Sequence, residues 1–189
     1  MSFWDALLGR NKLKAPDLDR VFGLVGASAT LNDDLGLQPS GRGGLCLKPV
    51  EGGGFRLTDK ELGDLVRLAA KDMKADLAIS DDEFGYRWIV FSDPQLEDLV
   101  NLVHLAASTL QEQGFGEHLL AAVFAFKAAG GGPVYLIYNY KRGSFYPFAP
   151  RSGRQRDLKL EFETSSALSG ELSMEKDTAR WYPLWDCPV

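Results

Sequence analysis

Histidine and cysteine are scarce in this chain of 189 residues, which contains two of each. Cys46 and Cys187 lie near opposite ends and have neither redox nor zinc-site spacing. We therefore expect two free thiols rather than a structural disulfide. Since His104 and His118 are the only histidines, neither a Ser-His-Asp triad nor a multi-histidine metal site can be assembled convincingly.

The sequence also lacks a glycine-rich phosphate loop, a zinc-binding H-E-x-x-H and a G-x-S-x-G nucleophile motif. Glycine runs at 41–44, 52–54 and 130–132 do not lead into strong helix starts, so we interpret them as turns. The acidic stretch 81–83 lacks the ligand pattern of a calcium loop and predicts a polar hairpin turn. We expect no catalytic residues, no cofactor and no metal, although catalysis by carboxylates or lysine alone leaves no such signature.

Basic residues are outnumbered, with 21 Lys and Arg against 26 Asp and Glu and a formal net charge of −5. Phosphate binding needs a surplus of cations, so nucleic acid is excluded as the main partner. No stretch reaches the roughly 18 apolar residues of a membrane-spanning helix, and the N-terminus does not read as a signal peptide. The sequence therefore predicts a cytoplasmic globular protein.

Residues 1–16 form a distinct amphipathic arm ahead of a single α+β domain at 17–189. One helical face of the arm is apolar and cations follow it; these residues are Phe3, Trp4, Leu7, Leu8, Arg10, Lys12 and Lys14. Burial of each apolar side chain is worth roughly 1.5–3 kcal/mol, and each cation adds about 1 kcal/mol near anionic lipid. The arm docks either on the inner membrane surface or a partner, or on the protein's own core or a second copy.

Hydrophobic periodicity predicts three helices, at 17–26, 58–74 and 92–113. The segment 157–172 is open between strand and helix: Leu158, Leu160 and Phe162 alternate like a strand, whereas its length and its Glu, Leu and Ala content favour a helix. Strands are predicted at 29–31, 45–50, 78–80, 87–91, 119–126, 134–140 and 145–148, and 32–44 is interpreted as a loop. The strand at 119–126 is apolar on both faces, which is typical of a central strand. This order indicates an α+β fold with a mainly antiparallel sheet and flanking helices.

Local signals set the ends of the predicted helices. Asp17 is a candidate cap of the first helix, and Thr58 with Glu61 has the spacing of a capping box. Ser92 with Gln95 has the same spacing before the helix at 92–113. On that helix, His104 lies opposite the apolar stripe and is expected at the surface. His118 begins an apolar strand and is expected to be held by backbone groups.

Charge is segregated late in the chain. The stretch 141–159 is basic, with Lys141, Arg142, Arg151, Arg154, Arg156 and Lys159, and 161–177 is acidic, with Glu161, Glu163, Glu171, Glu175 and Asp177. The two stretches either pair with each other or leave a basic docking patch for an acidic partner or anionic head groups. The aromatic segment 181–185 (WYPLW) must pack on some surface.

Three segments resemble a known family. Residues 1–10 (MSF…LLGR), 41–53 (GRGGLCLKPVEGG) and 175–186 (EKD…RWYPLWD) are similar to the PspA-associated PspAB proteins. The resemblance implies association with the phage-shock, or envelope-stress, system, with PspA or a membrane metalloprotease of the HtpX type as partner. It supplies no catalytic residue. The element order also resembles the type III secretion chaperone-like and YbjN-like fold, whose members bind proteins.

Two functions follow from these observations. The first is a non-enzymatic adaptor or regulator that binds a protein partner and contacts the membrane through its arm. Its partner surface would include Arg42, Arg151, Arg154 and Trp181. Core packing is the alternative role for Trp181 and Trp185. The second is a small-molecule-binding or enzymatic domain with an aromatic site on the sheet, lined by Tyr135, Tyr138, Tyr140 and Tyr146 with Arg142 or His118. A dimerisation module is a third reading, and the oligomeric state is left open.

Overall fold

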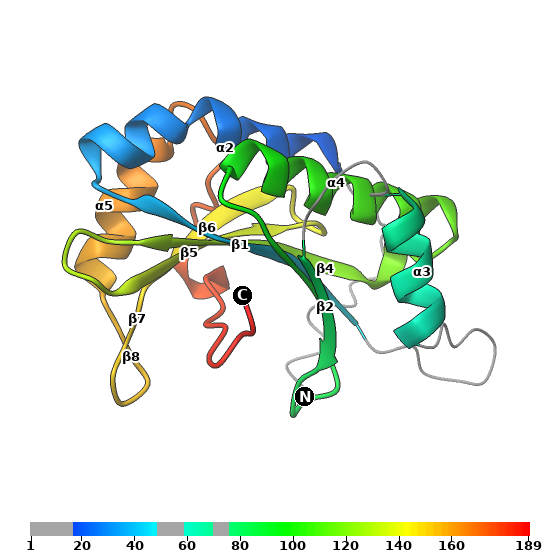
Figure 1. Cartoon of the computed structure of the whole chain (residues 1–189). Coiled ribbons are helices and arrows are strands. Elements are labelled where there is room, and N and C mark those ends of the chain that lie inside the picture. The colour runs from blue at the N-terminus through cyan, green and yellow to red at the C-terminus, as the bar shows by residue number, and fades with distance from the viewer. Residues whose placement is uncertain (1–16, 49–58, 70–75) are drawn as a thin grey trace.

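A six-stranded antiparallel sheet dominates the computed structural model, which describes residues 17–48, 59–69 and 76–189 (Figure 1). The strands follow one another across the sheet in the order β2-β3-β1-β4-β5-β6. Their bounds are β1 Gln38–Leu47, β2 Asp76–Asp81, β3 Arg87–Ser92, β4 Leu119–Lys127, β5 Pro133–Asn139 and β6 Ser144–Phe148. A separate short hairpin follows, formed by β7 Pro150–Arg151 and β8 Gln155–Arg156.

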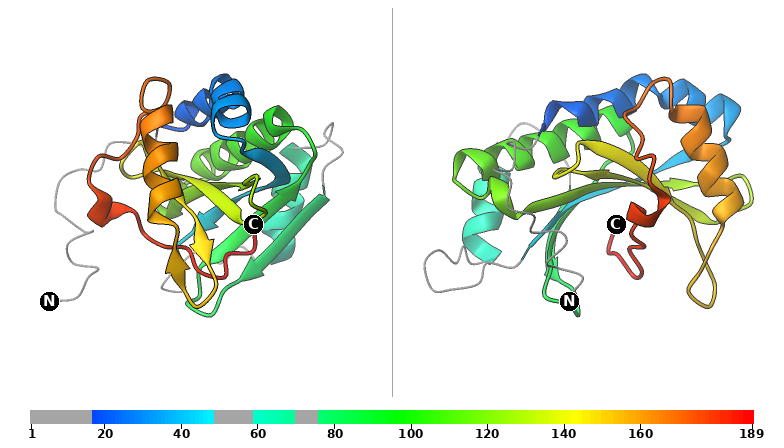
Figure 2. Two further views of the ribbon diagram at one scale, coloured as in Figure 1. Left: turned by 90° about the vertical axis from the view of Figure 1, so that its left-hand side faces the viewer. Right: turned by 180° about the vertical axis from the view of Figure 1, so that it is seen from behind.

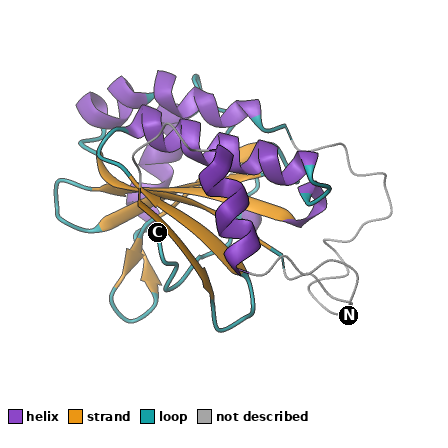
Figure 3. Cartoon of the chain, turned by 45° about the vertical axis from the view of Figure 1, so that its right-hand side comes forward, coloured by secondary structure: helices purple, strands orange, loops and turns teal. Residues whose placement is uncertain are grey.

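The longer helices gather on one face of this sheet (Figures 1 and 3). The longer ones are α3 Asp59–Ala69, α4 Leu96–Glu112 and α5 Leu158–Leu168. Short helical turns make up the rest: η1 Asp19–Phe22, α2 Gly23–Gly26, η2 Thr30–Asp34, η3 Gly116–His118 and η4 Thr178–Arg180. The class is therefore α+β with flanking helices, as predicted, and the finer chaperone-like resemblance stays a prediction.

Two hydrophobic clusters lie on opposite faces of the sheet, and β4 contributes to both. Ala122, Phe124 and Phe126 face the helices, whereas Val123 and Ala125 face the other side. Successive side chains of a strand alternate between faces, so a strand buried on both sides must be apolar throughout. The prediction of a central strand at 119–126 is thus confirmed.

The beginning of β1 corrects the sequence analysis, which interpreted 32–44 as a loop. Residues 38–44 belong to β1, which pairs with both β3 and β4. Glycine is required here by close strand packing, because a Cβ on Gly44 would lie 2.5 Å from the carbonyl oxygen of Ile89. The glycines at 41–44, which are typical of a turn, therefore lie in a tightly packed central strand.

Three further predictions of local structure are wrong. The expected strand at 29–31 is helical, and Asp17 pairs with Arg20 at 2.7 Å instead of capping a helix. At the start of α4, the Ser92 capping box is absent, and the Asp93 carboxylate accepts from the Gln95 N–H at 2.8 Å. Helix is confirmed for 59–69, 96–112 and 158–168. Thr58 lies outside the described residues.

We expect Gly44→Ala to lower the free energy of unfolding by about 1–3 kcal/mol, because the methyl group collides with the β3 backbone. Urea unfolding followed by circular dichroism measures this difference. Gly26→Ala is the matched control, since a Cβ there meets no atom within 4 Å. Equal stability of the two variants would show that β1 does not pack as described.

Candidate functional site

The sheet face opposite the helices is covered in part by the last residues of the chain, 181–189, here called the tail (Figure 2). In the right-hand view of Figure 2, the tail lies between the β2–β3 hairpin and the β7–β8 hairpin. Trp181 and Val189 are buried, and Trp185 and Cys187 are partly buried against the same cluster. The expectation that the WYPLW segment packs on a surface is therefore confirmed.

Specific contacts hold the tail in place. Arg42 donates to the backbone oxygen of Pro188, and Arg154 pairs with Asp186 at 3.1 Å. The Trp185 ring stands edge-on to Phe148, with 4.9 Å between ring centroids. The tail is thus anchored by both polar and aromatic contacts along its length.

A buried ion pair fixes the point where the tail begins. Glu161 of α5 is fully buried, and its Oε2 lies 2.8 Å from a guanidinium nitrogen of Arg156. The other carboxylate oxygen accepts from the backbone N–H of Ala149 at 2.8 Å. Arg156 also donates to the backbone oxygen of Trp181 at 2.8 Å, so one guanidinium joins α5 to the tail.

An open groove of about 510 Å³ lies beside the tail on this face. It lies over strands β1, β4 and β6 and is lined by the β2–β3 hairpin, the tail, the turn between β5 and β6, and Arg154 of the β7–β8 hairpin. We call it the aromatic groove. Its principal lining residues are Phe84, Tyr86, Trp88, Tyr146, Tyr182, Leu184 and Trp185, with Cys46, Ala121, Asn139, Lys141, Arg142 and Arg154.

Asp82 builds the hairpin wall of the aromatic groove. One carboxylate oxygen accepts from the N–H groups of Phe84 and Tyr86, both at 2.9 Å, and the other accepts from the Trp88 indole at 3.0 Å. The acidic turn is thus a scaffold for aromatic side chains. Phe84 lies in the turn of this hairpin and is 69% exposed, although the turn was predicted to be polar.

Cations line the end of the groove at the β5–β6 turn. The Asn139 carboxamide oxygen accepts from the Lys141 N–H at 3.1 Å and so shapes this turn. Arg142 pairs with Glu175 at 4.0 Å. Burial, and then the charge of Lys48, lowers the pKa of the Lys141 amine, whereas Glu117 raises it. The groove therefore combines apolar walls with a positive end.

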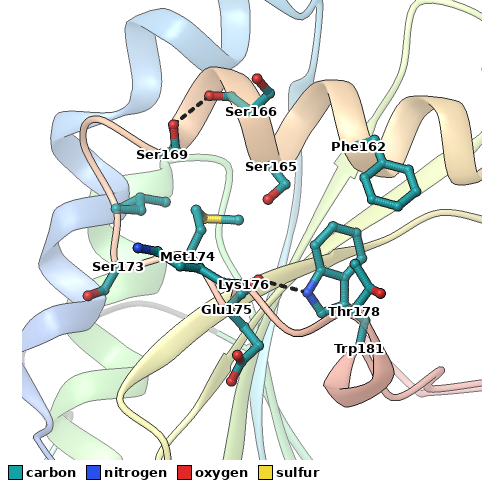
Figure 4. Close-up of a pocket in the computed structure, with 11 residues that line it drawn as sticks. Phe162, Ser165, Ser166, Ser169, Ser173, Met174, Glu175, Lys176, Thr178 and Trp181 are labelled. Atoms are coloured by element: carbon teal, nitrogen blue, oxygen red, sulfur yellow. Dashed lines mark hydrogen bonds between the residues drawn. The ribbon is translucent and has the colours of Figure 1, made fainter.

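A second hollow, of about 460 Å³, lies between α5 and residues 172–181 (Figure 4). Hydroxyl groups line it, from Ser165, Ser166, Ser169, Ser173 and Thr178. The Trp181 indole donates to the Glu175 backbone oxygen at 3.0 Å across its floor. The Glu175 carboxylate pairs with Arg142 and Arg180, so it is not free to act on a ligand in this hollow. The aromatic groove is the stronger candidate site.

The structure separates the predicted partner residues. Arg42 and Arg154 both contact the tail, whereas Arg151 pairs with Asp157 beside α5. Trp181 is buried and packs near Phe162, with ring centroids 5.4 Å apart. The arm residues Phe3, Trp4, Leu7, Leu8, Arg10, Lys12 and Lys14 lie outside the described residues.

The four tyrosines proposed for one site lie on two faces of the sheet. Tyr138 and Tyr140 pack in the cluster under the helices, and Tyr135 and Tyr146 pack on the tail side. Of these four tyrosines, Tyr146 is the one among the lining residues of the aromatic groove. The reason is strand alternation, since positions of opposite parity along β5 point to opposite faces.

Neither histidine contributes to the groove lining given above. His104 is partly buried rather than at the surface as predicted, because Phe22 packs on its ring at 4.6 Å. Its Nε2 lies 2.9 Å from Asp19. His118 was expected to be satisfied by backbone groups, but its buried Nδ1 has no partner in the described part of the chain, although its own N–H and C=O are hydrogen-bonded.

The segregated charges largely pair with each other. Bridges between the basic and acidic stretches join Arg156 to Glu161, Lys159 to Glu163 and Arg142 to Glu175. This confirms the first of the two readings for these three cations, whereas Arg151 and Arg154 pair with Asp157 and Asp186 outside the acidic stretch.

We expect Glu161→Ala to lower the free energy of unfolding by about 3–5 kcal/mol, because it leaves Arg156 without its buried counter-charge. Lys159→Ala is the control, since its bridge to Glu163 is exposed and worth under about 1 kcal/mol. Thermal and urea unfolding measure both variants. A loss of similar size in both would mean that the buried pair has no special role.

Within 17–48, 59–69 and 76–189, no helix has the length and apolarity to cross a membrane, and no cluster of His, Cys, Asp and Glu is suited to a metal ion. Comparisons with curated proteins and with solved structures give no significant match. The family model of PspA associated protein B, PspAB, matches residues 1–189. The chain therefore belongs to the PspAB family, whose name associates it with PspA.

Proposed function

We propose that this protein is a non-enzymatic adaptor or regulator of a PspA-type envelope-stress system and binds its protein partner in the aromatic groove. The observation that carries the proposal is an open, aromatic-lined groove on the sheet face that the helices leave uncovered. Aromatic side chains dominate the binding energy of protein interfaces. PspA is the first candidate partner, from the family name, and a membrane protease is the second.

The chemistry of the groove favours binding over catalysis. The Asp82 carboxylate is occupied by three hydrogen bonds within its own hairpin. Burial raises the pKa of the Cys46 thiol and of the Tyr146 hydroxyl far above neutrality, so neither supplies a nucleophile or base at pH 7. The groove is open rather than enclosed, which suits a protein segment better than a small substrate.

Phe84→Ser should weaken binding to purified PspA by about ten- to a hundredfold, because the serine no longer buries an aromatic ring in the interface. Isothermal titration calorimetry measures the affinity. Leu68→Ser is the matched control, since Leu68 is an equally exposed apolar residue, at 71%, on α3. Unchanged affinity of the Phe84 variant, or an equal loss in both variants, would refute the groove as the binding site.

The arm is proposed to hold the adaptor at the inner face of the membrane from the cytoplasm. Its apolar face and following cations have the composition of an interfacial helix. A helix of about ten residues is marginal alone in water, so the arm gains stability by docking.

Deletion of residues 1–14 should abolish co-sedimentation with vesicles that contain anionic phospholipid, because it removes both the apolar face and the cations. The full chain on uncharged vesicles is the control for the electrostatic part. If the full chain and the truncated chain bind equally, or neither binds, the arm docks on protein instead.

A further inference from the structure

We infer that Lys141 selects the partner, and that the occupant of the aromatic groove is an acidic amphipathic segment that places a carboxylate on Lys141 and apolar side chains on the aromatic walls. This inference rests on the proposed function and specifies the chemistry of the partner. Lys141 is a specificity-determining residue because of its position and because it forms no ion pair with a carboxylate of the described residues.

The position of Lys141 is set by the turn between β5 and β6. Asn139 holds this turn through the Lys141 N–H and the backbone N–H groups of Arg142 and Gly143, the last at 2.8 Å. The Lys141 side chain is partly buried at the groove lining, beside the same cavity as Phe84 and Trp185. A ligand in the groove therefore meets this amine.

The neighbouring cations all have an acidic partner within the chain. Arg142, Arg151, Arg154, Arg156 and Lys159 pair with Glu175, Asp157, Asp186, Glu161 and Glu163 respectively. Within the described part of the chain, no carboxylate lies within 4.0 Å of the Lys141 amine. Lys141 is thus the member of the basic stretch whose charge is still available to a partner.

Charge and shape together define the occupant. Glu117 acts on the Lys141 amine, but only from beyond ion-pair distance. A partly buried ammonium group without an ion pair is unfavourable, and a carboxylate brought by the ligand lowers that cost. Asp82 lines the same groove, but its two oxygens are used by the hairpin. The apolar walls supply affinity, and Lys141 rejects segments that place a cation or no charge at this point.

A tiled array of 15-residue PspA peptides, probed with the full-length protein, tests the inference. We expect the bound peptides to contain Asp or Glu next to large apolar residues. Lys141→Glu should reduce their binding at least tenfold, and Lys141→Arg should retain it within about threefold. Lys127→Glu is the matched control, because it makes the same change in net charge on an exposed residue at the far end of β4.

A charge exchange makes the assignment specific. Replacing the acidic residue of the strongest peptide by its amide should weaken binding to wild type and leave binding to Lys141→Gln unchanged. Thermal unfolding of each variant confirms that it is folded.

The outcomes separate the inference from the proposed function. If Phe84→Ser loses the peptides while Lys141→Glu binds them as wild type does, the groove binds its partner and the role of Lys141 is overturned. If wild type binds neither PspA nor any of its peptides, both the proposed function and the inference about Lys141 are refuted. Dodecanoate is the competing probe, and its binding in the absence of any peptide binding would overturn the inference in favour of a small anionic amphiphile.

Discussion

The buried pair of Arg156 and Glu161 is the interaction on which the arrangement of the tail face depends. Through it, α5 on the helix side is joined to the backbone of Ala149 and to the first residue of the tail. Such a pair contributes little net stability against an apolar replacement, but either partner left alone is strongly destabilising. Its value here is positional, because the same guanidinium holds the backbone oxygen of Trp181, where the tail begins.

The aromatic groove is a consequence of that constraint. A tail held at Trp181 and again through Asp186 and Pro188 covers one part of the sheet and leaves the part beside the β2–β3 hairpin open. Asp82 then turns the hairpin so that Phe84 and its neighbours form the opposite wall. The helices stabilise one face of the sheet, and the other face is available for a partner.

Much of this fold was predictable because its signals are local. The strand at 119–126 follows from its continuous apolar run, the helix at 158–168 from the length and composition of its segment, and the confirmed hairpin from two strands around a polar turn. Alternation alone could have separated Tyr135 from Tyr138 and placed Tyr86 with Trp88 on one face. Residues 38–44 of β1 were missed because the glycines there signal a turn, whereas in the structure Gly44 allows close packing against β3.

By itself, the sequence determined an α+β protein of the PspAB family, without known catalytic or metal motifs and with opposite charges in adjacent stretches. These properties depend on residue types and short spacings. Only the tertiary structure decided which cations form ion pairs, and that Lys141 forms none with the described residues, because pairs such as Arg154 with Asp186 join residues far apart in the chain. It also decided where the groove lies, since its lining residues come from segments far apart in the chain that meet only when the sheet has folded.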